Sequence, residues 1–170
     1  MPASDHLDRS LTDLARRYVG LAFLVSGDRD LALDVVADVT LRIIERGSEP
    51  HIDNLDAFFR RSVVNRAIDL GRRRARAFRG VTDWTCDEDA GDIADAAIAV
   101  VMVGQALKRI SPKLRAVVVL RYYDDLSERE IAEVLAIPVG TVKSRMSRAL
   151  AQLEQSLTGE HIRQSGEDPR

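Results

Sequence analysis

Apolar residues recur at steps of three and four through the first part of the chain, which is the period of one face of an α-helix. Three such runs cover residues 7–25, 31–43 and 58–70. No stretch in this half alternates between apolar and polar residues as a half-buried strand does. The pattern therefore predicts three helices, and the residues suited to begin or end them are Gly27, Asp28 or Asp30, and Asp53 or Asn54. Gly71 weakens the third helix by roughly 1 kcal/mol relative to alanine, which leaves a bend or frayed end open there.

Residues 126–157 carry a different pattern, two helices joined by a short turn. The first helix opens with a capping box and a hydrophobic staple, formed by Ser127 with Glu130 and by Leu126 with Ile131. Pro138 cannot continue a helix from its interior but suits a first turn, so a second helix is predicted from about Val139. This arrangement is a helix-turn-helix.

The second of these helices has two distinct sides. An apolar stripe is formed by Val142, Met146, Ala149, Leu150, Leu153 and Leu157. The other side carries hydroxyl and basic groups, from Thr141, Ser144, Arg145 and Arg148. Such groups contact phosphates and base edges in the major groove of DNA. For a lone helix a solvated basic face would be the better interpretation, but the capped helix pair favours DNA binding.

Two further helices are predicted before this pair, over residues 98–110 and from Pro112 to Tyr122, and both are expected to pack on the helix-turn-helix. Periodicity fails between them and the N-terminal helices. We therefore predict an all-α protein with two small helical domains, at 1–79 and 97–158, the second a winged-helix-like domain of four helices. A flexible acidic linker at 80–96 joins them, and residues 159–170 are predicted to be a disordered tail.

Composition narrows the class of protein. The chain has 170 residues and 45% hydrophobic content, enough to bury a core, and no run long enough to span a membrane. The N-terminus lacks the features of a secretory signal, so we expect a cytoplasmic protein. One cysteine, Cys86, and three histidines at scattered positions, His6, His51 and His161, predict no metal site, and nothing predicts another cofactor.

The net charge of −2 conceals a strong local contrast. Between residues 58 and 79 there are eight arginines and one acid, Asp69, whereas residues 81–96 hold six acids and no base. The basic segment predicts a patch for a polyanion. Trp84 lies within the acidic segment, either as padding against a domain surface or as an anchor for a partner.

Catalytic motifs are not apparent. Asp124 and Asp125 are the nearest approach to paired carboxylates, but neighbours in a turn do not converge on one substrate atom, so we interpret them as solvated acids. A helical nuclease would need a convergent set of acids, histidines or metal ligands. The chain is not expected to be an enzyme.

The order of these features resembles the extracytoplasmic-function (ECF) class of bacterial RNA polymerase sigma factors. The segment LSEREIAEVLAIPVGTVKSRMSRAL, with its GTVKSR motif, is similar to region four of that family, and AFFRRSVVNRAIDLGRRRAR is similar to region two. In the second segment Phe58-Phe59 stands where the family commonly has Trp-Leu. The resemblance implies a cytoplasmic subunit, monomeric when free, that binds core RNA polymerase and promoter DNA and is held by an anti-sigma factor.

The resemblance also assigns residues to these partners. Contacts to the minus 35 element are implied for Thr141, Lys143, Ser144, Arg145 and Arg148. Contacts to the minus 10 element, made as the strands separate, are implied for the loop 48–54 and for Arg61, Asn65, Asp69, Arg72, Arg73, Arg74 and Arg76. Core polymerase is expected to meet Asp34, Asp38 and Arg42, although Ala37 and Thr40 replace the family's usual Gln and Phe. The main alternative is a stand-alone helix-turn-helix repressor or activator, which the basic segment at 58–79 disfavours.

Overall fold

The computed structural model describes residues 3–46, 54–77 and 103–164, which form helices and the short connections between them. The N-terminal half consists of α1 (Ala3–Ser26), α2 (Arg29–Arg46) and α3 (Leu55–Ala77). The C-terminal half consists of a helical segment at 103–109 followed by α5 (Pro112–Tyr122), α6 (Glu128–Leu135) and α7 (Val139–Gln164). These ranges contain no strand, so the all-α prediction is confirmed. The predicted linker at 80–96, Trp84 included, and the loop at 48–53 lie outside the described residues.

The ends of the N-terminal helices are set by local hydrogen bonds. Gly27 ends α1 with φ +79°, and its N–H donates to the carbonyl of Phe23 at 2.7 Å. Asp28 and Asn54 precede α2 and α3, and the side-chain oxygen of each accepts a hydrogen bond of 2.9 Å from the backbone N–H three residues later. The structure thus selects Asp28 and Asn54 among the candidate caps.

The helix-turn-helix begins and turns where the sequence predicts. Ser127 Oγ accepts from the N–H of Glu130 at 3.3 Å, and Glu130 Oε2 accepts from the N–H of Ser127 at 2.8 Å. Ala136 takes the left-handed conformation that ends α6, with φ 51°, and α7 begins at Val139. The staple residues Leu126 and Ile131 are both buried. The predicted capping box is therefore confirmed.

Helix α3 passes through Gly71 without interruption. Gly71 is buried, and a Cβ built on it would lie 3.3 Å from both the Pro112 side chain and the Ser26 carbonyl oxygen. A larger residue would push apart three elements that meet at this point. Close packing of α3 against the end of α1 and the start of α5 explains a glycine inside a helix, where its backbone entropy is unfavourable.

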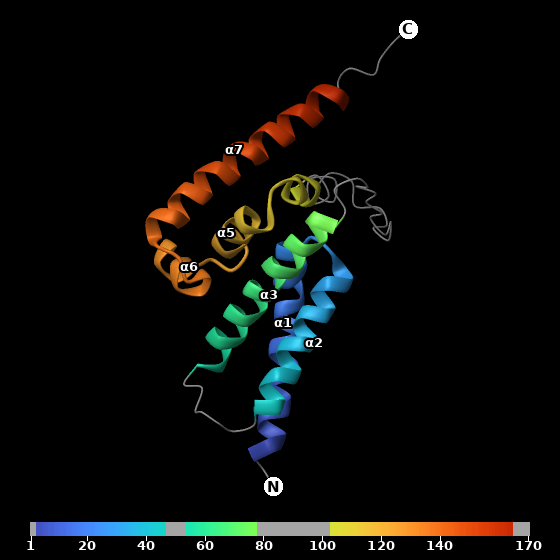
Figure 1. Ribbon diagram of the computed structural model, residues 1–170, viewed down its shortest axis with the longest axis vertical. Coiled ribbons are helices and arrows are strands. Elements are labelled where there is room, and N and C mark those ends of the chain that lie inside the picture. Colours follow the sequence, from blue (N-terminus) through green and yellow to red (C-terminus); the bar gives the residue numbers. More distant parts are fainter. Residues whose placement is uncertain (1–2, 47–53, 78–102, 165–170) are drawn as a thin grey trace.

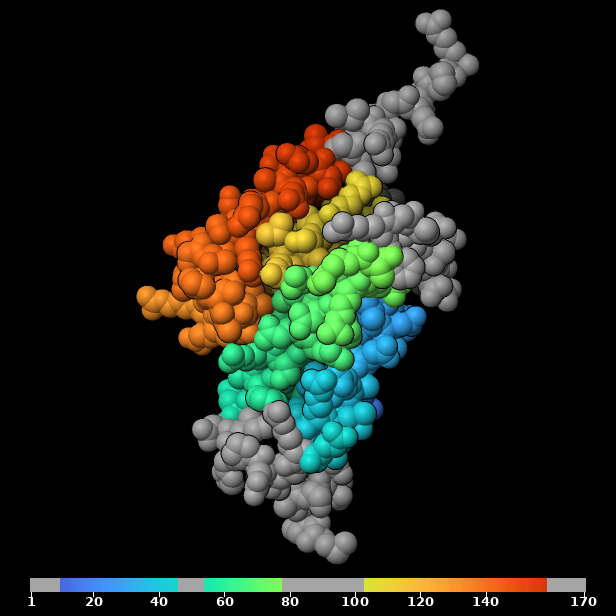
Figure 2. All heavy atoms as spheres, viewed as in Figure 1, coloured from blue at the N-terminus to red at the C-terminus, as the bar shows by residue number. Residues whose placement is uncertain are grey.

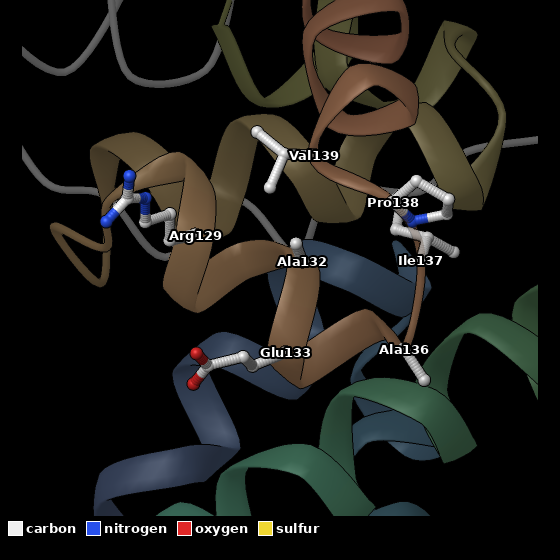
Figure 3. Close-up of a pocket in the computed structure, with 7 residues that line it drawn as sticks. All are labelled: Arg129, Ala132, Glu133, Ala136, Ile137, Pro138 and Val139. Atoms are coloured by element: carbon white, nitrogen blue, oxygen red, sulfur yellow. The ribbon is translucent and has the colours of Figure 1, made fainter.

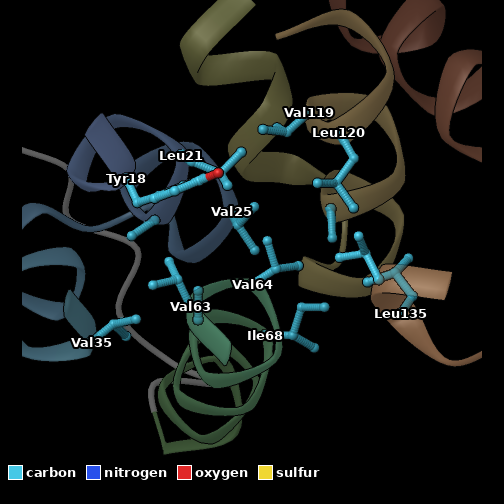
Figure 4. Close-up of a cluster of buried hydrophobic side chains, with 14 of the residues drawn as sticks. Tyr18, Leu21, Val25, Val35, Val63, Val64, Ile68, Val119, Leu120 and Leu135 are labelled. Atoms are coloured by element: carbon cyan, nitrogen blue, oxygen red, sulfur yellow. The ribbon is translucent and has the colours of Figure 1, made fainter. Parts of the chain in front are cut away.

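One hydrophobic core runs through both halves. The largest buried cluster combines residues of α1, α2 and α3 with residues of α5, α6 and α7, and Figure 4 shows part of it, including Leu21, Val64, Leu120 and Leu135. In Figure 2 the yellow and orange atoms of the C-terminal half lie directly against the green atoms of α3 in the N-terminal half. The two predicted helical domains are thus in direct contact, which the sequence pattern did not predict.

A smaller cluster lies within the C-terminal half. It joins Leu107, Ile110, Val118 and Ala149, so the helical segment at 103–109 and α5 do pack on the helix-turn-helix as expected.

Two expectations about α7 are corrected. The helix continues to Gln164 instead of ending at Leu157, because residues 158–164 contain no proline and each added residue completes another backbone hydrogen bond. The start predicted for the tail, at residue 159, is therefore wrong, and residues 165–170 lie outside the described residues. Leu150 was assigned to the packed stripe but is 41% exposed, since it lies about 80° around the helix axis from Val142.

Candidate nucleic-acid interface

The first turns of α7 present the predicted DNA-binding side chains on one face. Lys143, Ser144 and Arg148 are exposed, whereas Thr141 and Arg145 are half-buried. The opposite side is fixed to the core through Val142 and Ala149, both fully buried. Burial of one side therefore holds the polar side toward solvent, where a DNA groove can reach it.

Short hydrogen bonds organise this polar face. Ser144 Oγ donates to the carbonyl of Thr141 at 3.1 Å, and Arg148 Nε donates to the carbonyl of Ser144 at 3.1 Å. Lys143 Nζ lies 3.7 Å from Glu128 Oε2, and both groups are exposed. Because exposed ion pairs contribute little, Lys143 remains available for a phosphate. The face carries positive charge and hydroxyl groups together.

A hollow of about 540 Å³ lies beside this face, at the turn between α6 and α7 (Figure 3). Its lining is largely apolar, with one charged group of each sign, and consists of Arg129, Ala132, Glu133, Ala136, Ile137, Pro138 and Val139. None of the residues predicted to contact DNA lines it. The hollow is therefore separate from the predicted DNA-binding face.

Helix α3 carries the second predicted DNA surface, which begins at Arg61 and runs to the C-terminal turns. Arg61, Asp69, Arg73 and Arg76 are exposed, and Arg72 is half-buried. Several other arginines of the basic segment instead have structural partners: Arg60 Nε lies 2.8 Å from Asp124, Arg66 Nε 2.8 Å from Asp38, and Arg74 Nη2 2.9 Å from Asp28. The basic patch is smaller than the arginine count in the sequence suggests.

Helix α2 displays a mixed surface at the position predicted for a protein partner. Asp34 is exposed, while Asp38 Oδ2 forms ion pairs with Arg42 at 3.2 Å and with Arg66 at 2.8 Å, so it also joins α2 to α3. Around Asp34 the helix exposes large apolar side chains, namely Leu33 (49%), Leu41 (57%) and Ile44 (50%). These three exposed residues were not predicted from the sequence. The sequence does carry a signal for them. Val35, Val39 and Ile43 already fill the buried side of α2, so its further apolar residues must lie on the exposed side.

Comparison with known proteins agrees with this geometry. Residues 101–153 match the family Sigma-70, region 4. The ECF RNA polymerase sigma factor SigL of Mycobacterium tuberculosis is 33% identical over 144 residues, which cover 80% of each chain. The chain belongs to the ECF family of RNA polymerase sigma factors.

The Streptomyces relatives of this sigma-factor chain match over a smaller share of their length. The RNA polymerase sigma-E factor of Streptomyces avermitilis is 35% identical over 105 residues, which are 60% of this chain and 56% of that protein. For the Streptomyces proteins, the matched segment thus covers little more than half of each relative's length. The fold is similar to that of the sigma factor RpoE in a co-crystal structure with the anti-sigma factor NepR from Bartonella quintana. The TM-score is 0.63 and the identity 22%, over 90% of this chain and 97% of that one.

The halves of this sigma factor are joined by polar contacts as well as by the shared core. Asn65 Nδ2 donates to the carbonyl of Val134 in α6 at 3.3 Å. Asp124 was interpreted as a solvated acid, but its side chain is only 12% exposed and lies 2.8 Å from Arg60. That interpretation is wrong because packing of α3 against the turn after α5 brings the two charges together. Burial raises the pKa of Asp124, and the Arg60 charge opposes this shift.

Arg115 forms the most buried of these contacts. Its guanidinium donates to the backbone carbonyls of Leu107, Lys108 and Ile110 within its own half and to Val25 in α1. Burial lowers the pKa of Arg115 to about 10, so the group stays charged at neutral pH. Four carbonyl oxygens stabilise the buried charge, and one of them belongs to the other half.

Within residues 3–46, 54–77 and 103–164, no helix is both long and apolar enough to cross a bilayer. The same residues contain no group of three or more His, Cys, Asp or Glu side chains arranged to hold a metal ion.

Proposed function

We propose that this chain binds core RNA polymerase, directs it to specific promoters and helps to open the minus 10 element, without catalysis of its own. The observation that carries the proposal is the solvent-facing polar side of α7 in a member of the ECF sigma-factor family. In this proposal residues 1–79 act as sigma region two, 80–96 as an acidic linker and 97–158 as region four. The protein works in the cytoplasm, where core polymerase and promoters are found.

Region four would read the minus 35 element with α7 in the major groove. Lys143 and Arg148 are exposed and suited to phosphates, while Arg145, held close to the helix by partial burial, is placed for a base edge. Thr141 and Ser144 add hydroxyl groups on the same face. Recognition helices of this motif use such a mixture of positioning and reading contacts.

Region two would hold the minus 10 element as its strands separate. The exposed arginines of α3 attract the backbone, and an amide or carboxylate such as Asn65 or Asp69 can hydrogen-bond a base taken out of the stack. Flipping a base costs a few kcal/mol, which such contacts offset. The support for this role is the exposed position of Arg61, Asp69, Arg73 and Arg76 along one helix.

Core polymerase would dock on the exposed side of α2. Asp34 provides charge, and Leu33, Leu41 and Ile44 provide apolar area that is otherwise unfavourably exposed to water. We assign Asp38 and Arg42 a supporting part, because they pair with each other and Asp38 also binds Arg66. Two solved structures of similar fold are complexes, one of the sigma factor RpoE with the anti-sigma factor NepR and one of CnrH with the cytosolic domain of CnrY. We propose an anti-sigma partner for this chain as well.

Run-off transcription with purified core polymerase on a promoter library tests the proposal. We expect the protein to produce specific starts that core polymerase alone does not produce. Leu41→Glu should abolish them by placing a charge in the docking surface. Leu150→Glu, at an exposed leucine on α7 outside this surface, should preserve them. Absence of any specific start with the parent protein would refute the function, and tight duplex binding without transcription would favour a stand-alone repressor.

A further inference from the structure

The polar face of α7 contains a chain of three hydrogen bonds that stays within the helix. Arg148 Nε donates to the carbonyl of Ser144 at 3.1 Å, and Arg148 Nη2 donates to Ser144 Oγ at 3.4 Å. Ser144 Oγ in turn donates to the carbonyl of Thr141 at 3.1 Å. Two different atoms of Ser144 therefore hold the guanidinium of Arg148 against the helix.

The hydroxyl of Ser144 has already used its proton in this arrangement. A serine hydroxyl has one O–H donor and two acceptor lone pairs. In Ser144 the donor goes to the carbonyl of Thr141, and the oxygen accepts from Arg148. Because the phosphate oxygens of DNA only accept hydrogen bonds, Ser144 can donate to a phosphate only by breaking its bond to Thr141.

Arg148 keeps enough donors to bind DNA. A guanidinium carries five N–H donors in a fixed, planar fork. The two hydrogen bonds to Ser144 use two of these donors, and the Arg148 side chain is exposed, so the remaining donors can reach a ligand. A long side chain that is already held in one geometry loses less entropy when it binds. The arrangement therefore suits Arg148 to contact DNA and Ser144 to orient it.

Lys143, on the same face, is held less firmly than Arg148. Its Nζ lies 3.7 Å from Glu128 Oε2, and an ion pair of this length between exposed groups restricts neither side chain strongly. We propose that Ser144 is a positioning residue: it fixes Arg148 for the minus 35 element and acts on DNA through that guanidinium, not by a contact of its own. This inference rests on the proposed function, because it needs α7 to bind duplex DNA. It replaces the direct contact that the family resemblance implies for Ser144.

A double-mutant cycle separates positioning from direct contact. The full chain with core polymerase is titrated against a duplex promoter fragment that gives a specific start in run-off transcription. Ser144→Ala should weaken binding about two- to fivefold, because Arg148 must then be ordered during binding. In an Arg148→Ala background the same substitution should have no further effect, since the group that Ser144 holds is gone. Equal losses in both backgrounds would indicate a direct contact of Ser144, and no loss in either would mean that ordering Arg148 is unimportant; each of these results overturns the proposal.

Ser156→Ala is the matched control for this titration. Ser156 Oγ donates to the carbonyl of Gln152 at 2.9 Å, about three turns farther along the same helix. Both substitutions replace a serine that bonds to its own helix with alanine, the better helix former, so neither should weaken α7. Ser156→Ala should therefore keep the promoter affinity of the parent. A loss as large as that of Ser144→Ala would mean that the effect is general to α7, and the positioning role would fall.

The order of the Arg148 side chain is measured in the free protein. Nitrogen-15 relaxation of its Nε–H group reports motion of the guanidinium on the picosecond-to-nanosecond timescale, and Arg148→Lys identifies the signal by its loss. We expect more motion in Ser144→Ala than in the parent. Ser144→Thr should restore the order, because a threonine hydroxyl in a helix can also bond to a carbonyl one turn back. Unchanged motion in Ser144→Ala would contradict the positioning role.

The proposed function is assessed separately, by run-off transcription with the parent protein. Specific starts together with an effect of Ser144→Ala that does not depend on Arg148 would overturn only the positioning role. Absence of specific starts would overturn the function, while the relaxation measurement still decides whether Ser144 holds Arg148.

Discussion

Replacing Gly27 with alanine is expected to destabilise the protein strongly. Gly27 has φ +79°, where an alanine costs about 1–2 kcal/mol because its Cβ approaches the carbonyl oxygen. The added Cβ would also fall on Arg115 Nη1, the atom that donates to the Val25 carbonyl at 3.3 Å. Losing a hydrogen bond from a buried charged group costs about 1.5–3 kcal/mol. The two effects together predict a loss of about 2.5–5 kcal/mol.

Urea unfolding followed by far-ultraviolet circular dichroism measures this loss. Gly104→Ala is the matched control, because a Cβ at Gly104 meets no atom within 4 Å and the residue lies in a helix. That variant should gain about 0.5–1 kcal/mol from the lower entropy of its unfolded chain. The two identical substitutions should therefore shift stability in opposite directions.

A small effect at Gly27 would refute the reasoning. If Gly27→Ala lowers the free energy of unfolding by less than about 1 kcal/mol, the Arg115 guanidinium must move away from the new Cβ at little cost. The guanidinium would then not be fixed by its four carbonyls, and the contact between α1 and α5 would be weaker than the geometry indicates. An unchanged m-value is needed for this comparison, since a changed slope would mean that the denatured state or the cooperativity had altered.

Three further predictions concern the cap and the two DNA surfaces. Hydrogen bonds from Ser127 lower the pKa of Glu130 below its ordinary 4.5, so Glu130 contributes stability above pH 4.5 that is lost as the pH falls through its folded pKa. The difference in free energy of unfolding between the parent and Glu130→Gln should therefore narrow as the pH is lowered below 4.5. Glu133→Gln, which lies outside the capping box, should not show this pH dependence. Arg145→Ala should weaken binding of minus 35 duplex by about 1–3 kcal/mol if Arg145 reads a base. In the same gel-shift titration Arg16→Ala, at an exposed position of α1, should leave duplex binding unchanged. Equal losses of duplex affinity in the two variants would reject base reading by Arg145. Asn65→Ala should spare duplex binding and impair promoter opening detected by permanganate reactivity, and equal impairment of both would contradict its assigned role.

Much of the local structure followed from short-range sequence signals. The capping box at Ser127 and Glu130, the cap at Asn54 and the left-handed turn at Gly27 each depend on atoms within four residues of one another. The period of apolar residues then predicted which side of each helix is buried. Such signals also fixed the start of α7 and hence the face that carries Lys143 and Arg148.

Contacts between residues far apart in the chain could not be predicted from these short-range signals. Asp124 was interpreted as solvated because it stands beside Asp125 in a turn between two helices, whereas its partner Arg60 is 64 positions away. Arg74 was counted with the DNA-binding arginines, but it pairs with Asp28, which lies between α1 and α2. The exposed leucines of α2 were missed because one helix side alone satisfied the expected pattern.

The sequence by itself thus determined the helices, their caps and the polar face of α7, since these depend on backbone hydrogen bonds and side-chain period within single segments. Only the tertiary structure decided which charges remain free for a partner and which are used inside the protein. It also decided that the two halves share a core, with Asn65 bound to Val134 and Arg115 bound to Val25. The physical reason is that burial and ion pairing depend on which helix faces meet in space, and residues far apart in the chain supply those faces.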